Sequence, residues 1–359
     1  MKHLIDPTDL TREETDEIIA LAEEIIANRE KYQSVMAHRK LATLFYEPST
    51  RTRLSFTAAM MELGGNVLGF SDAKNSSVSK GETVQDTVRV VGCFADIIAM
   101  RHSLEGAPLV AAEVAGVPII NAGDGSHSHP TQTLTDLLTI KRERGGIEGI
   151  TIGFCGDLRF GRTVHSLIKA LSRYKGINVV LIAPPELRLP SYIKQDVCDK
   201  MGVKYRETTS LDEALPELDV LYMTRVQKER FLDEDEFDRV KDSFILDARR
   251  MALGKKDMCV LHPLPRVNEI LPEVDADPRA AYFRQVENGK FVRMALICKL
   301  LEWKDDPAHA MPEQEPPVLD ATLHCTNPKC ICNNEHIQPR FRASDGGVMR
   351  CWYCDAKVR

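Results

Sequence analysis

Glu47-Pro48-Ser49-Thr50-Arg51-Thr52-Arg53 follows an apolar run, Lys40 to Phe45, and precedes a stretch whose apolar residues have helical spacing. This order predicts a strand, a tight turn and a helix N-terminus. The first turn of a helix offers unpaired N–H groups and the positive end of the helix dipole, so it binds anions. The alternative is an ordinary N-cap at Ser49 followed by solvated arginines. Two arginines alternating with two threonines favour a phosphate site, because guanidinium and hydroxyl groups are good phosphate donors.

The stretch is not a Walker loop, because it lacks the glycines and the closing Gly-Lys-Ser/Thr. Pro48-Ser49-Thr50-Arg51-Thr52-Arg53 instead resembles the carbamoyl-phosphate signature of the aspartate and ornithine carbamoyltransferases. The resemblance implies that carbamoyl phosphate is bound by Ser49, Thr50, Arg51 and Thr52. It extends over nearly the whole chain, with about 1–305 similar to a catalytic chain of the aspartate branch.

Composition places limits on the class of protein. The chain has 359 residues and a formal net charge of −6, which gives no general case for nucleic-acid or membrane binding. Its first residues lack an apolar signal core, and no segment approaches the length of a membrane span. We expect a soluble cytoplasmic protein.

Short apolar runs alternate with helix-length segments, a pattern typical of parallel α/β architecture. The fold class we predict is two parallel-sheet α/β domains with an active-site cleft between them, plus a small C-terminal four-cysteine domain resembling a zinc ribbon. The first half is expected to hold four strands near 41–46, 66–70, 96–100 and 117–121. The second half is expected to hold strands near 151–155, 178–183, 219–224, 243–247 and 259–262.

The predicted domains are a carbamoyl-phosphate-binding domain over 1–135, joined by a closing helix over 288–304, and an aspartate-binding domain over 136–287. A linker over 305–320 and a zinc-binding domain over 321–359 follow. Polar residues cluster after the predicted strands, and ligands of open α/β sheets bind at the carboxyl ends of strands. The charged stretch 228–242 is interpreted as a mobile substrate loop.

The loop 123–132 contains two histidines, His127 and His129, and a lone histidine is more often structural than catalytic. His129 is favoured, because His129-Pro130-Thr131-Gln132 resembles the His-Pro-x-Gln motif of the family. The resemblance implies that His129 binds the carbonyl oxygen of carbamoyl phosphate and that Gln132 binds its amide. Thr52 and Arg101 resemble the other donors around that oxygen, where negative charge develops during attack.

The polar stretch 71–83 has the composition of an exposed loop. Its end, Lys80-Gly81-Glu82-Thr83, resembles a loop of the family whose serine and lysine enter the active site of a neighbouring subunit. Lys80 is the clear match, and the serine is either Ser76 or Ser77, with Ser77 taken as the candidate. The resemblance implies a homotrimer or a dimer of trimers with shared active sites.

Gly156 to Ser166 lacks the Gly-x-Gly-x-x-Gly spacing of a dinucleotide turn, and no acid follows the next predicted strand to bind a ribose. The stretch resembles the aspartate branch of the family, in which Arg162 binds a carboxylate. Aspartate has two carboxylates, so its pocket needs fixed cations. The resemblance makes Arg225 the second cation for aspartate, with Gln227 as an orienting amide and Lys80 as a further aspartate-binding residue. His262-Pro263-Leu264-Pro265 lacks the cysteine of the ornithine branch, and Leu264 and Pro265 resemble carbonyl contacts to the carbamoyl group.

The implied reaction is carbamoyl transfer from carbamoyl phosphate to the α-amine of L-aspartate, giving N-carbamoyl-L-aspartate and phosphate. Carbamoyl phosphate has a good leaving group, so orientation and charge stabilisation suffice and no catalytic cofactor is expected. The residues expected to carry catalysis are Arg51, Thr52, Arg101 and His129. Two alternatives are a non-catalytic regulator with this fold and a carbamoyltransferase for another amino acid.

Five of the ten cysteines fall in the last 35 positions, and in a reducing compartment such a cluster favours metal binding over disulfides. The pairs Cys325/Cys330 and Cys351/Cys354 have the spacing of a closed structural zinc site. Cys332 is a spare thiol that could replace Cys330. Residues 321–359 have six basic and three acidic residues, so nucleic-acid binding is an alternative.

The cysteine module, and Cys351-Trp352-Tyr353-Cys354 above all, resembles the zinc domain of the regulatory chain of aspartate carbamoyltransferase. Only the linker separates it from the closing helix, which leaves no room for the nucleotide-binding domain of a regulatory chain. We therefore expect the module to assist assembly without a CTP or ATP effector site.

Overall fold

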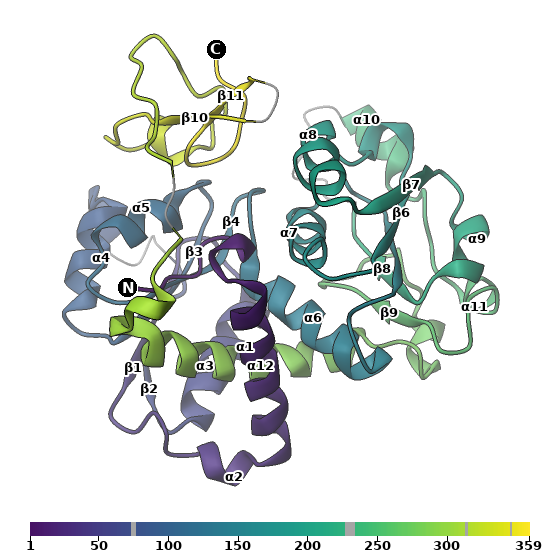
Figure 1. Cartoon of the computed structure of the whole chain (residues 1–359), viewed down its shortest axis with the longest axis horizontal. Helices are drawn as coiled ribbons and strands as arrows, with labels where there is room; N and C mark the ends of the chain where they lie inside the picture. Colours follow the sequence, from purple (N-terminus) through teal and green to yellow (C-terminus); the bar gives the residue numbers. More distant parts are fainter. Residues whose placement is uncertain (73–76, 227–233, 313–314, 345–346) are drawn as a thin grey trace. The chain divides into compact units, whose positions relative to one another are not determined.

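The computed structural model describes residues 1–72, 77–226, 234–312, 315–344 and 347–359. The chain forms two compact units (Figure 1). The first comprises Met1–Thr131 and Gly289–Arg359, and the second comprises Gln132–Asn288. Each unit contains its own parallel sheet, so the predicted fold class of two parallel-sheet α/β domains is confirmed.

The sheet of the first unit has the strand order β2-β1-β3-β4, and every pair is parallel. Its strands are β1 (Lys40–Phe45), β2 (Asn66–Phe70), β3 (Ile97–His102) and β4 (Ile119–Asp124). The connecting helices are α3 (Thr50–Glu62), α4 (Val84–Gly92) and α5 (Ala107–Val114). β3 and β4 are buried along their whole length, as expected of strands covered on both faces. All four strands lie within a few residues of the predicted positions.

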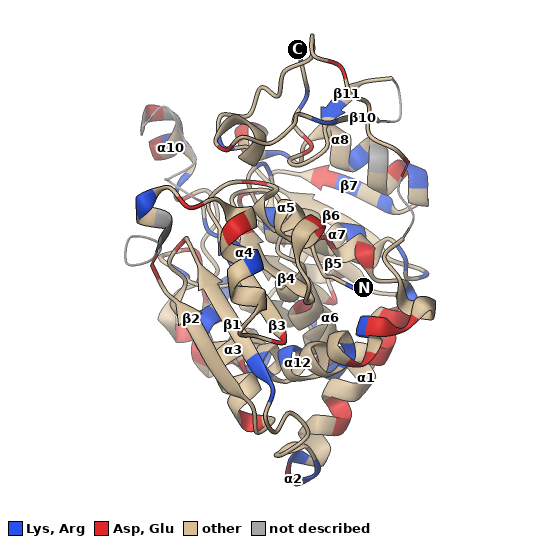
Figure 2. Ribbon diagram, turned by 90° about the vertical axis from the view of Figure 1, so that its left-hand side faces the viewer, with Lys and Arg blue, Asp and Glu red and all other residues tan. Residues whose placement is uncertain are grey.

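The N-terminal segment completes this unit. Helix α1 (Arg12–Ala27) begins at the capping box formed by Thr11 and Glu14, and the short helix α2 (Arg29–Tyr32) follows. Ahead of α1, Leu4 pairs with β4 through two main-chain bonds, Leu4 N–H to Ile119 and Asn121 N–H to Leu4. The apolar residues Ile18, Ala22 and Ile25 of α1 are buried. Figure 2 shows that acidic residues recur along the same helix.

The sheet of the second unit has the order β7-β6-β5-β8-β9 and is also parallel. Its strands are β5 (Thr151–Cys155), β6 (Asn178–Ile182), β7 (Lys204–Thr208), β8 (Val220–Met223) and β9 (Cys259–Leu261). The helices of this part of the chain are α6 (Pro130–Arg144), α7 (Arg162–Leu171), α8 (Ser191–Ile193), α9 (Leu211–Ala214), α10 (Glu234–Val240) and α11 (Ala248–Met251). Helices α6 and α12 (Tyr282–Glu302) cross the division between the units.

Two expectations about this sheet are wrong. Residues 243–247 do not form a strand: Leu246 makes an isolated bridge to Ile270, and α11 begins directly afterwards. Strand β7 was not predicted, because Lys204-Tyr205-Arg206-Glu207-Thr208 is an edge strand whose side chains are mostly exposed. Of the stretch 228–242, interpreted as a substrate loop, residues 234–240 form α10, and residues 228–233 lie outside the described part of the chain.

The chain after α12 is anchored to the first unit. The ring of His309 stacks on Trp303 at 4.4 Å between centroids, and its Nδ1 lies 3.0 Å from Oε1 of Glu14. The opposite oxygen of Glu14 accepts a bond of 2.9 Å from the buried Lys2. The cysteine module follows, with an antiparallel pair formed by β10 (Phe341–Ala343) and β11 (Met349–Cys351).

The cysteine module shares a hydrophobic core with the sheet of the first unit. Tyr353 and Ile331 belong to one buried cluster with residues of β1, β3 and α5. Gly106, at the start of α5, has φ of 83°, and a Cβ at this position would lie 2.5 Å from the Cβ of Tyr353. This close approach requires glycine.

Among the described helices of both units, none combines the length and apolar character needed to cross a membrane.

Candidate active site and metal centre

The predicted strand, turn and helix N-terminus are present at β1 and α3. Ser49 is the N-cap residue of α3, but its hydroxyl accepts no bond from the helix backbone. It lies 3.1 Å from the hydroxyl of Thr52, which is buried, while Thr50 and Arg51 are exposed in the first turn. Ser49 thus stands at the N-cap position, and its hydroxyl bonds Thr52 in place of the helix backbone. The arrangement presents a helix N-terminus with hydroxyl and guanidinium donors, as an anion site requires.

Arg101 lies at the end of β3, beside this helix. Its Nη1 donates to the carbonyl of Ala122 at 3.4 Å, and its Nη2 lies 3.3 Å from Oε2 of Glu47. The guanidinium is thus nearly buried and oriented by a carboxylate from the turn after β1. Sequence reasoning did not assign a role to Glu47, although its place directly before the signature was a usable signal.

His129 is buried ahead of α6, and its Nδ1 lies 3.4 Å from the hydroxyl of Thr131. That hydroxyl also lies 3.4 Å from Nη2 of Arg293, a buried residue of α12. Nη1 of Arg293 donates to Ser55 of α3 at 3.1 Å. Arg293 therefore connects the helix that carries Arg51 to the segment that carries His129. No local pattern indicates this role, because 238 residues separate Arg293 from Ser55.

Asp124 organises the loop that leads to His129. Its fully buried carboxylate accepts bonds from the Ser128 N–H at 3.0 Å, the Gly106 N–H at 2.9 Å and the Asn121 amide at 2.9 Å. It also lies 3.0 Å from Nδ1 of His127. Burial favours a neutral imidazole, but the carboxylates of Asp124 and Asp355 raise the pKa of His127 well above its ordinary value.

His102 behaves in the opposite way. Burial lowers the pKa of its imidazole to about 4, although the charge of Asp124 acts against this shift. Its Nδ1 accepts the Leu104 N–H at 2.9 Å, and its ring packs on Tyr46 at 4.3 Å between centroids. His102 is therefore a neutral structural histidine that shapes the turn after Arg101.

In the second unit, Arg162 is the first residue of α7 and Arg225 follows β8. The loops after β5 and β8 are joined by the Asp157 N–H, which donates to the Thr224 hydroxyl at 2.8 Å. Gly156 allows this approach: it has φ of 114°, and a Cβ there would lie 2.4 Å from the Thr224 carbonyl. The two loops that carry the predicted arginines are thus held together, and Gln227 lies outside the described residues.

Leu264 and Pro265 are joined by a cis peptide bond, and Leu264 has φ of 54°. The Leu264 N–H donates to Nδ1 of His262 at 2.8 Å, and Nε2 of His262 lies 2.8 Å from Glu269. Burial lowers the pKa of His262 in spite of that carboxylate, and the positive charges of Arg266 and Arg225 contribute to the shift. The buried histidine fixes the backbone at Leu264.

Gln132 opens the second unit, and its amide donates to Oδ1 of the buried Asp136 at 2.7 Å. Asp136 also accepts from Tyr222 at 3.0 Å and from Gln285 at 2.6 Å. In the first unit, Lys80 is exposed at the end of the short helix η3 (Ser77–Lys80). Ser76 lies outside the described residues, as does the side chain of Ser77.

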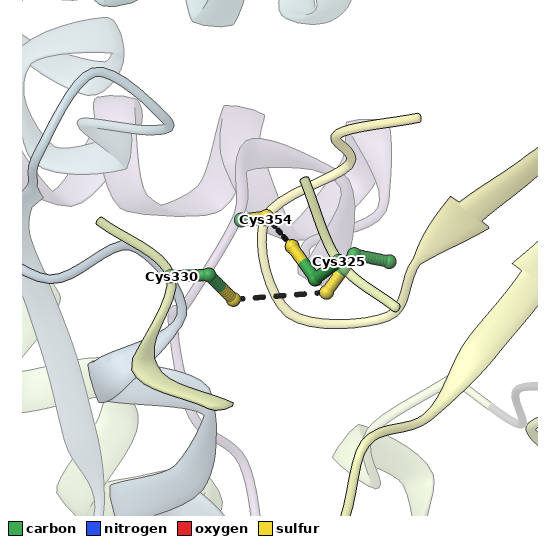
Figure 3. A group of neighbouring side chains, drawn as sticks. Cys325, Cys330 and Cys354 are labelled. Atoms are coloured by element: carbon green, nitrogen blue, oxygen red, sulfur yellow. Dashed lines mark hydrogen bonds between the residues drawn. The ribbon is translucent and has the colours of Figure 1, made fainter. Parts of the chain in front are cut away.

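The four predicted cysteines meet in one place. The sulfur atoms of Cys325, Cys330, Cys351 and Cys354 all lie within 4.8 Å of one another, and all four residues are buried. Cys325 and Cys354 are 3.5 Å apart, and Cys330 and Cys351 are 3.7 Å apart. Figure 3 shows the sulfur atoms of three of them converging. Tetrahedral thiolate ligation with Zn–S bonds of about 2.3 Å requires sulfur separations of about 3.8 Å, so the cluster fits a metal of this kind.

Cys332 belongs to the edge of this cluster, with its sulfur 3.3 Å from that of Cys330. It is half-buried, whereas the other four are buried, and it is not part of the group that surrounds a common point. The four cysteines that meet are therefore the predicted ones, with Cys330 and not Cys332 as the second member. All ten cysteines lie in the described part of the chain, and each is a free thiol.

Three family models match the chain. Residues 2–142 match the carbamoyl-P binding domain of aspartate/ornithine carbamoyltransferase, and residues 148–300 match its Asp/Orn binding domain. Residues 317–359 match the metal binding domain of the aspartate carbamoyltransferase regulatory chain.

The chain is also similar to named relatives. It is 60% identical over 301 residues to the aspartate carbamoyltransferase catalytic subunit of Lachnoclostridium phytofermentans, a match that covers 84% of this chain and 98% of that protein. The corresponding subunit of Clostridium perfringens is 60% identical over 300 residues, with the same coverage of both chains.

Solved structures agree in fold. The catalytic subunit of M. jannaschii aspartate transcarbamoylase superposes with a TM-score of 0.79 at 49% identity, covering 85% of this chain and 100% of that one. The Trypanosoma cruzi enzyme in complex with N-(phosphonacetyl)-L-aspartic acid superposes with a TM-score of 0.78 at 43% identity, covering 82% and 94%. The chain therefore belongs to the aspartate carbamoyltransferase family, and it carries a metal-binding domain of the regulatory-chain type in the same polypeptide.

Proposed function

We propose that this protein transfers the carbamoyl group of carbamoyl phosphate to the α-amino group of L-aspartate, an early step of de novo pyrimidine biosynthesis. The products are N-carbamoyl-L-aspartate and phosphate. The observation that carries the proposal is the N-terminus of α3, where Ser49, Thr50, Arg51 and Thr52 surround a helix start whose backbone the Ser49 hydroxyl does not bond. A dianionic phosphate matches the dipole, the amides and the guanidinium of this site.

The carbonyl oxygen of carbamoyl phosphate is assigned to Thr52, Arg101 and His129. These residues come from three segments of the first unit, and Arg101 is already oriented by Glu47. When the amine attacks the carbonyl carbon, the new C–N bond forms and the oxygen gains negative charge, which fixed donors stabilise. The C–O bond to phosphate then breaks, and the departing phosphate can accept the proton of the amine. Gln132, Leu264 and Pro265 are assigned to the carbamoyl amide.

Aspartate is assigned to the side chains Arg162, Arg225 and Gln227, with Lys80 as a further cation. Two fixed guanidinium groups suit two carboxylates, because an arginine binds a carboxylate through two parallel bonds. The hydrogen bond between the Asp157 N–H and Thr224, at 2.8 Å, supports this assignment because it links the loops that carry Arg162 and Arg225.

The metal of the cysteine module is proposed to be zinc with a structural role. Four thiolates close a tetrahedral site and leave no position for substrate, so the metal stabilises the module and takes no part in the transfer. Because a cysteine cluster of this spacing favours metal binding over disulfides in a reducing compartment, a cytoplasmic location is part of the proposal.

We infer that the active assembly is a homotrimer or a dimer of trimers. The proposal rests on the resemblance of Lys80 and Ser77 to residues that enter a neighbouring active site, and Lys80 is exposed as such a role requires. Sedimentation of the wild-type protein measures the oligomeric state. Mixing inactive Arg51→Ala chains with inactive Lys80→Ala chains tests whether active sites are shared between subunits. Sharing of sites predicts that the mixture recovers activity, whereas a persistently inactive mixture contradicts it.

The function is tested with metal-loaded protein supplied with carbamoyl phosphate and, in parallel, aspartate, ornithine and other amines. Formation of carbamoyl aspartate alone is expected. Arg51→Ala should reduce turnover at least about 100-fold, because preorganised charge stabilisation supplies much of such catalysis. Arg12→Ala, which changes a partly exposed arginine in the first turn of α1, is the matched control. If folded wild-type protein formed no carbamoylated product with any of the amines, the proposal would be refuted.

A further inference from the structure

The loop that leads to His129 contacts the cysteine module through Glu105. Oε1 of Glu105 accepts the Ser126 N–H at 3.0 Å, and Oε2 accepts the Asn327 amide at 2.7 Å. The backbone of Glu105 is also paired with the module: its N–H donates to the Lys329 carbonyl at 2.9 Å, and its carbonyl accepts the Ile331 N–H at 3.0 Å. One nearly buried carboxylate therefore joins the loop to the segment between Cys325 and Cys330.

A second connection runs through His127. Its Nδ1 lies 3.0 Å from the buried Asp124, and its Nε2 lies 3.3 Å from Oδ2 of Asp355 in the module. The other oxygen of Asp355 accepts a bond from Arg342. Asp124 in turn accepts the N–H of Ser128, the residue before His129. The two connections are independent, because they use different side chains on both sides.

Both module residues that contact the loop are held by the cysteine cluster. Asp355 directly follows Cys354, has φ of 60°, and donates its N–H to the carbonyl of Cys351 at 3.1 Å. The amide of Asn333 donates to the carbonyls of Cys325 and Asn327, at 3.0 Å and 2.8 Å. Residues beside metal ligands take their orientation from the metal site. The cluster therefore determines where Asp355 and Asn327 lie.

We infer that Asp355 and Asn327 are positioning residues for the transfer reaction: they hold Ser126 to Ser128 through His127 and Glu105, and so place His129. The inference rests on the proposed function for the role of His129 at the carbonyl oxygen. A displacement of about 1 Å in a catalytic group can lower turnover about 100-fold. The metal thus supports catalysis through the loop and without contact to substrate.

The test compares three variants with the wild-type chain. Asp355→Gly removes the carboxylate and tolerates the positive φ, Asp355→Asn keeps an acceptor for His127, and Asn327→Ala removes the amide that donates to Glu105. Arg340→Ala is the matched control, because it breaks a module contact of 2.7 Å to Glu113, which lies on α5 outside the loop.

The first readout does not depend on activity. Hydrogen exchange of the peptide covering 123–129 should become about tenfold faster in Asp355→Gly and in Asn327→Ala, since each loses a hydrogen bond that holds the loop. Removal of the metal by a chelator should have the same effect on the wild-type chain. Asp355→Asn and Arg340→Ala should exchange as the wild type does, with metal content unchanged in every variant.

The second readout is kinetic. Turnover should fall about tenfold in Asp355→Gly, with recovery in Asp355→Asn, while the KM for aspartate stays near the wild-type value. The inference would be overturned if hydrogen exchange of 123–129 were unchanged in both Asp355→Gly and Asn327→Ala. It would also be overturned if Arg340→Ala accelerated this exchange equally. If the wild-type chain forms no carbamoyl aspartate, the proposed function fails, and the exchange comparison still decides whether the module holds the loop.

Discussion

Nη2 of Arg101 lies 3.3 Å from Oε2 of Glu47, so the cation at the end of β3 is held by the residue that precedes the phosphate-type signature. The guanidinium-bearing residue is 9% exposed, which limits the ability of water to replace this partner. The pair links the carboxyl ends of β1 and β3. It therefore sets the direction in which Arg101 presents its remaining donors.

Glu47→Gln keeps the shape of this side chain and removes its charge. Turnover should fall about tenfold, because a nearly buried guanidinium loses the carboxylate of its ion pair and becomes less well oriented. Steady-state kinetics with carbamoyl phosphate and aspartate measure the effect. Glu62→Gln, which breaks the exposed pair with Lys290, is the control and should leave turnover unchanged. Wild-type turnover in Glu47→Gln would show that the orientation of Arg101 does not depend on Glu47.

Arg162→Gln tests the assignment of substrate carboxylates. The KM for aspartate should rise at least about tenfold while the KM for carbamoyl phosphate changes little, because a bidentate contact to one substrate is lost. Arg159→Gln provides a control in the same loop, since its guanidinium packs on Phe160 and bonds the Glu186 carbonyl. A rise in KM of equal size in both variants would contradict the assignment.

Cys351→Ser tests the ligand set of the metal site. Bound zinc should fall from about one per chain to almost none, because a structural site needs all four thiolates. Cys332→Ser should retain the metal, since Cys332 lies beside the group that shares a common centre. Metal analysis of the purified proteins distinguishes the two cases. Loss of zinc in Cys332→Ser with retention in Cys351→Ser would require a different set of ligands.

His102 makes stability depend on pH. Burial lowers the pKa of this group to about 4 in the folded chain, while the unfolded value is about 6.5. Between these values the unfolded chain binds more protons, so stability falls as pH drops from about 6.5 toward 4. Between pH 7 and pH 5 the loss from this group is about 2 kcal/mol.

His102→Asn keeps an acceptor for the Leu104 N–H and removes the titration. Urea unfolding at pH 7 and pH 5, followed by the fluorescence of Trp303 and Trp352 in the same unit, should show a smaller decrease in the free energy of unfolding for the variant. Equal decreases in the variant and the wild-type chain would show that His102 is not the group responsible.

Most of this fold can be predicted because its buried strands are apolar runs. β2 and β5 begin and end where the pattern placed them. The edge strand β7 was missed because its residues are mostly charged and exposed. Residues Phe244 to Leu246 were expected to form a strand because a buried loop segment contains the same apolar residues as a buried strand. Helix α12 begins at Tyr282, earlier than expected, because polar residues of its first turns obscure the helical pattern.

The candidate site follows the same rule. The four cysteines could be predicted as one cluster because their spacing along the chain indicates a metal site, and the same kind of local pattern makes Ser49 to Arg53 the candidate phosphate site. The contacts of Arg293, Glu105 and His127 could not be predicted, because each involves residues distant in the chain: 228 positions separate His127 from Asp355. Such contacts leave no periodicity in the sequence. They exist only once two sheets and a cysteine module have folded.

The cysteine module and the first unit belong to one polypeptide, and this affects how the module responds to dilution. A module on a separate polypeptide would leave its surface at low protein concentration, whereas a short tether keeps the effective local concentration on the order of millimolar. The contacts of His309 with Trp303 and Glu14 hold the start of this connection against the first unit. Occupancy of the surface around Glu105 is therefore set within each chain, so it is the same at any expression level of the protein.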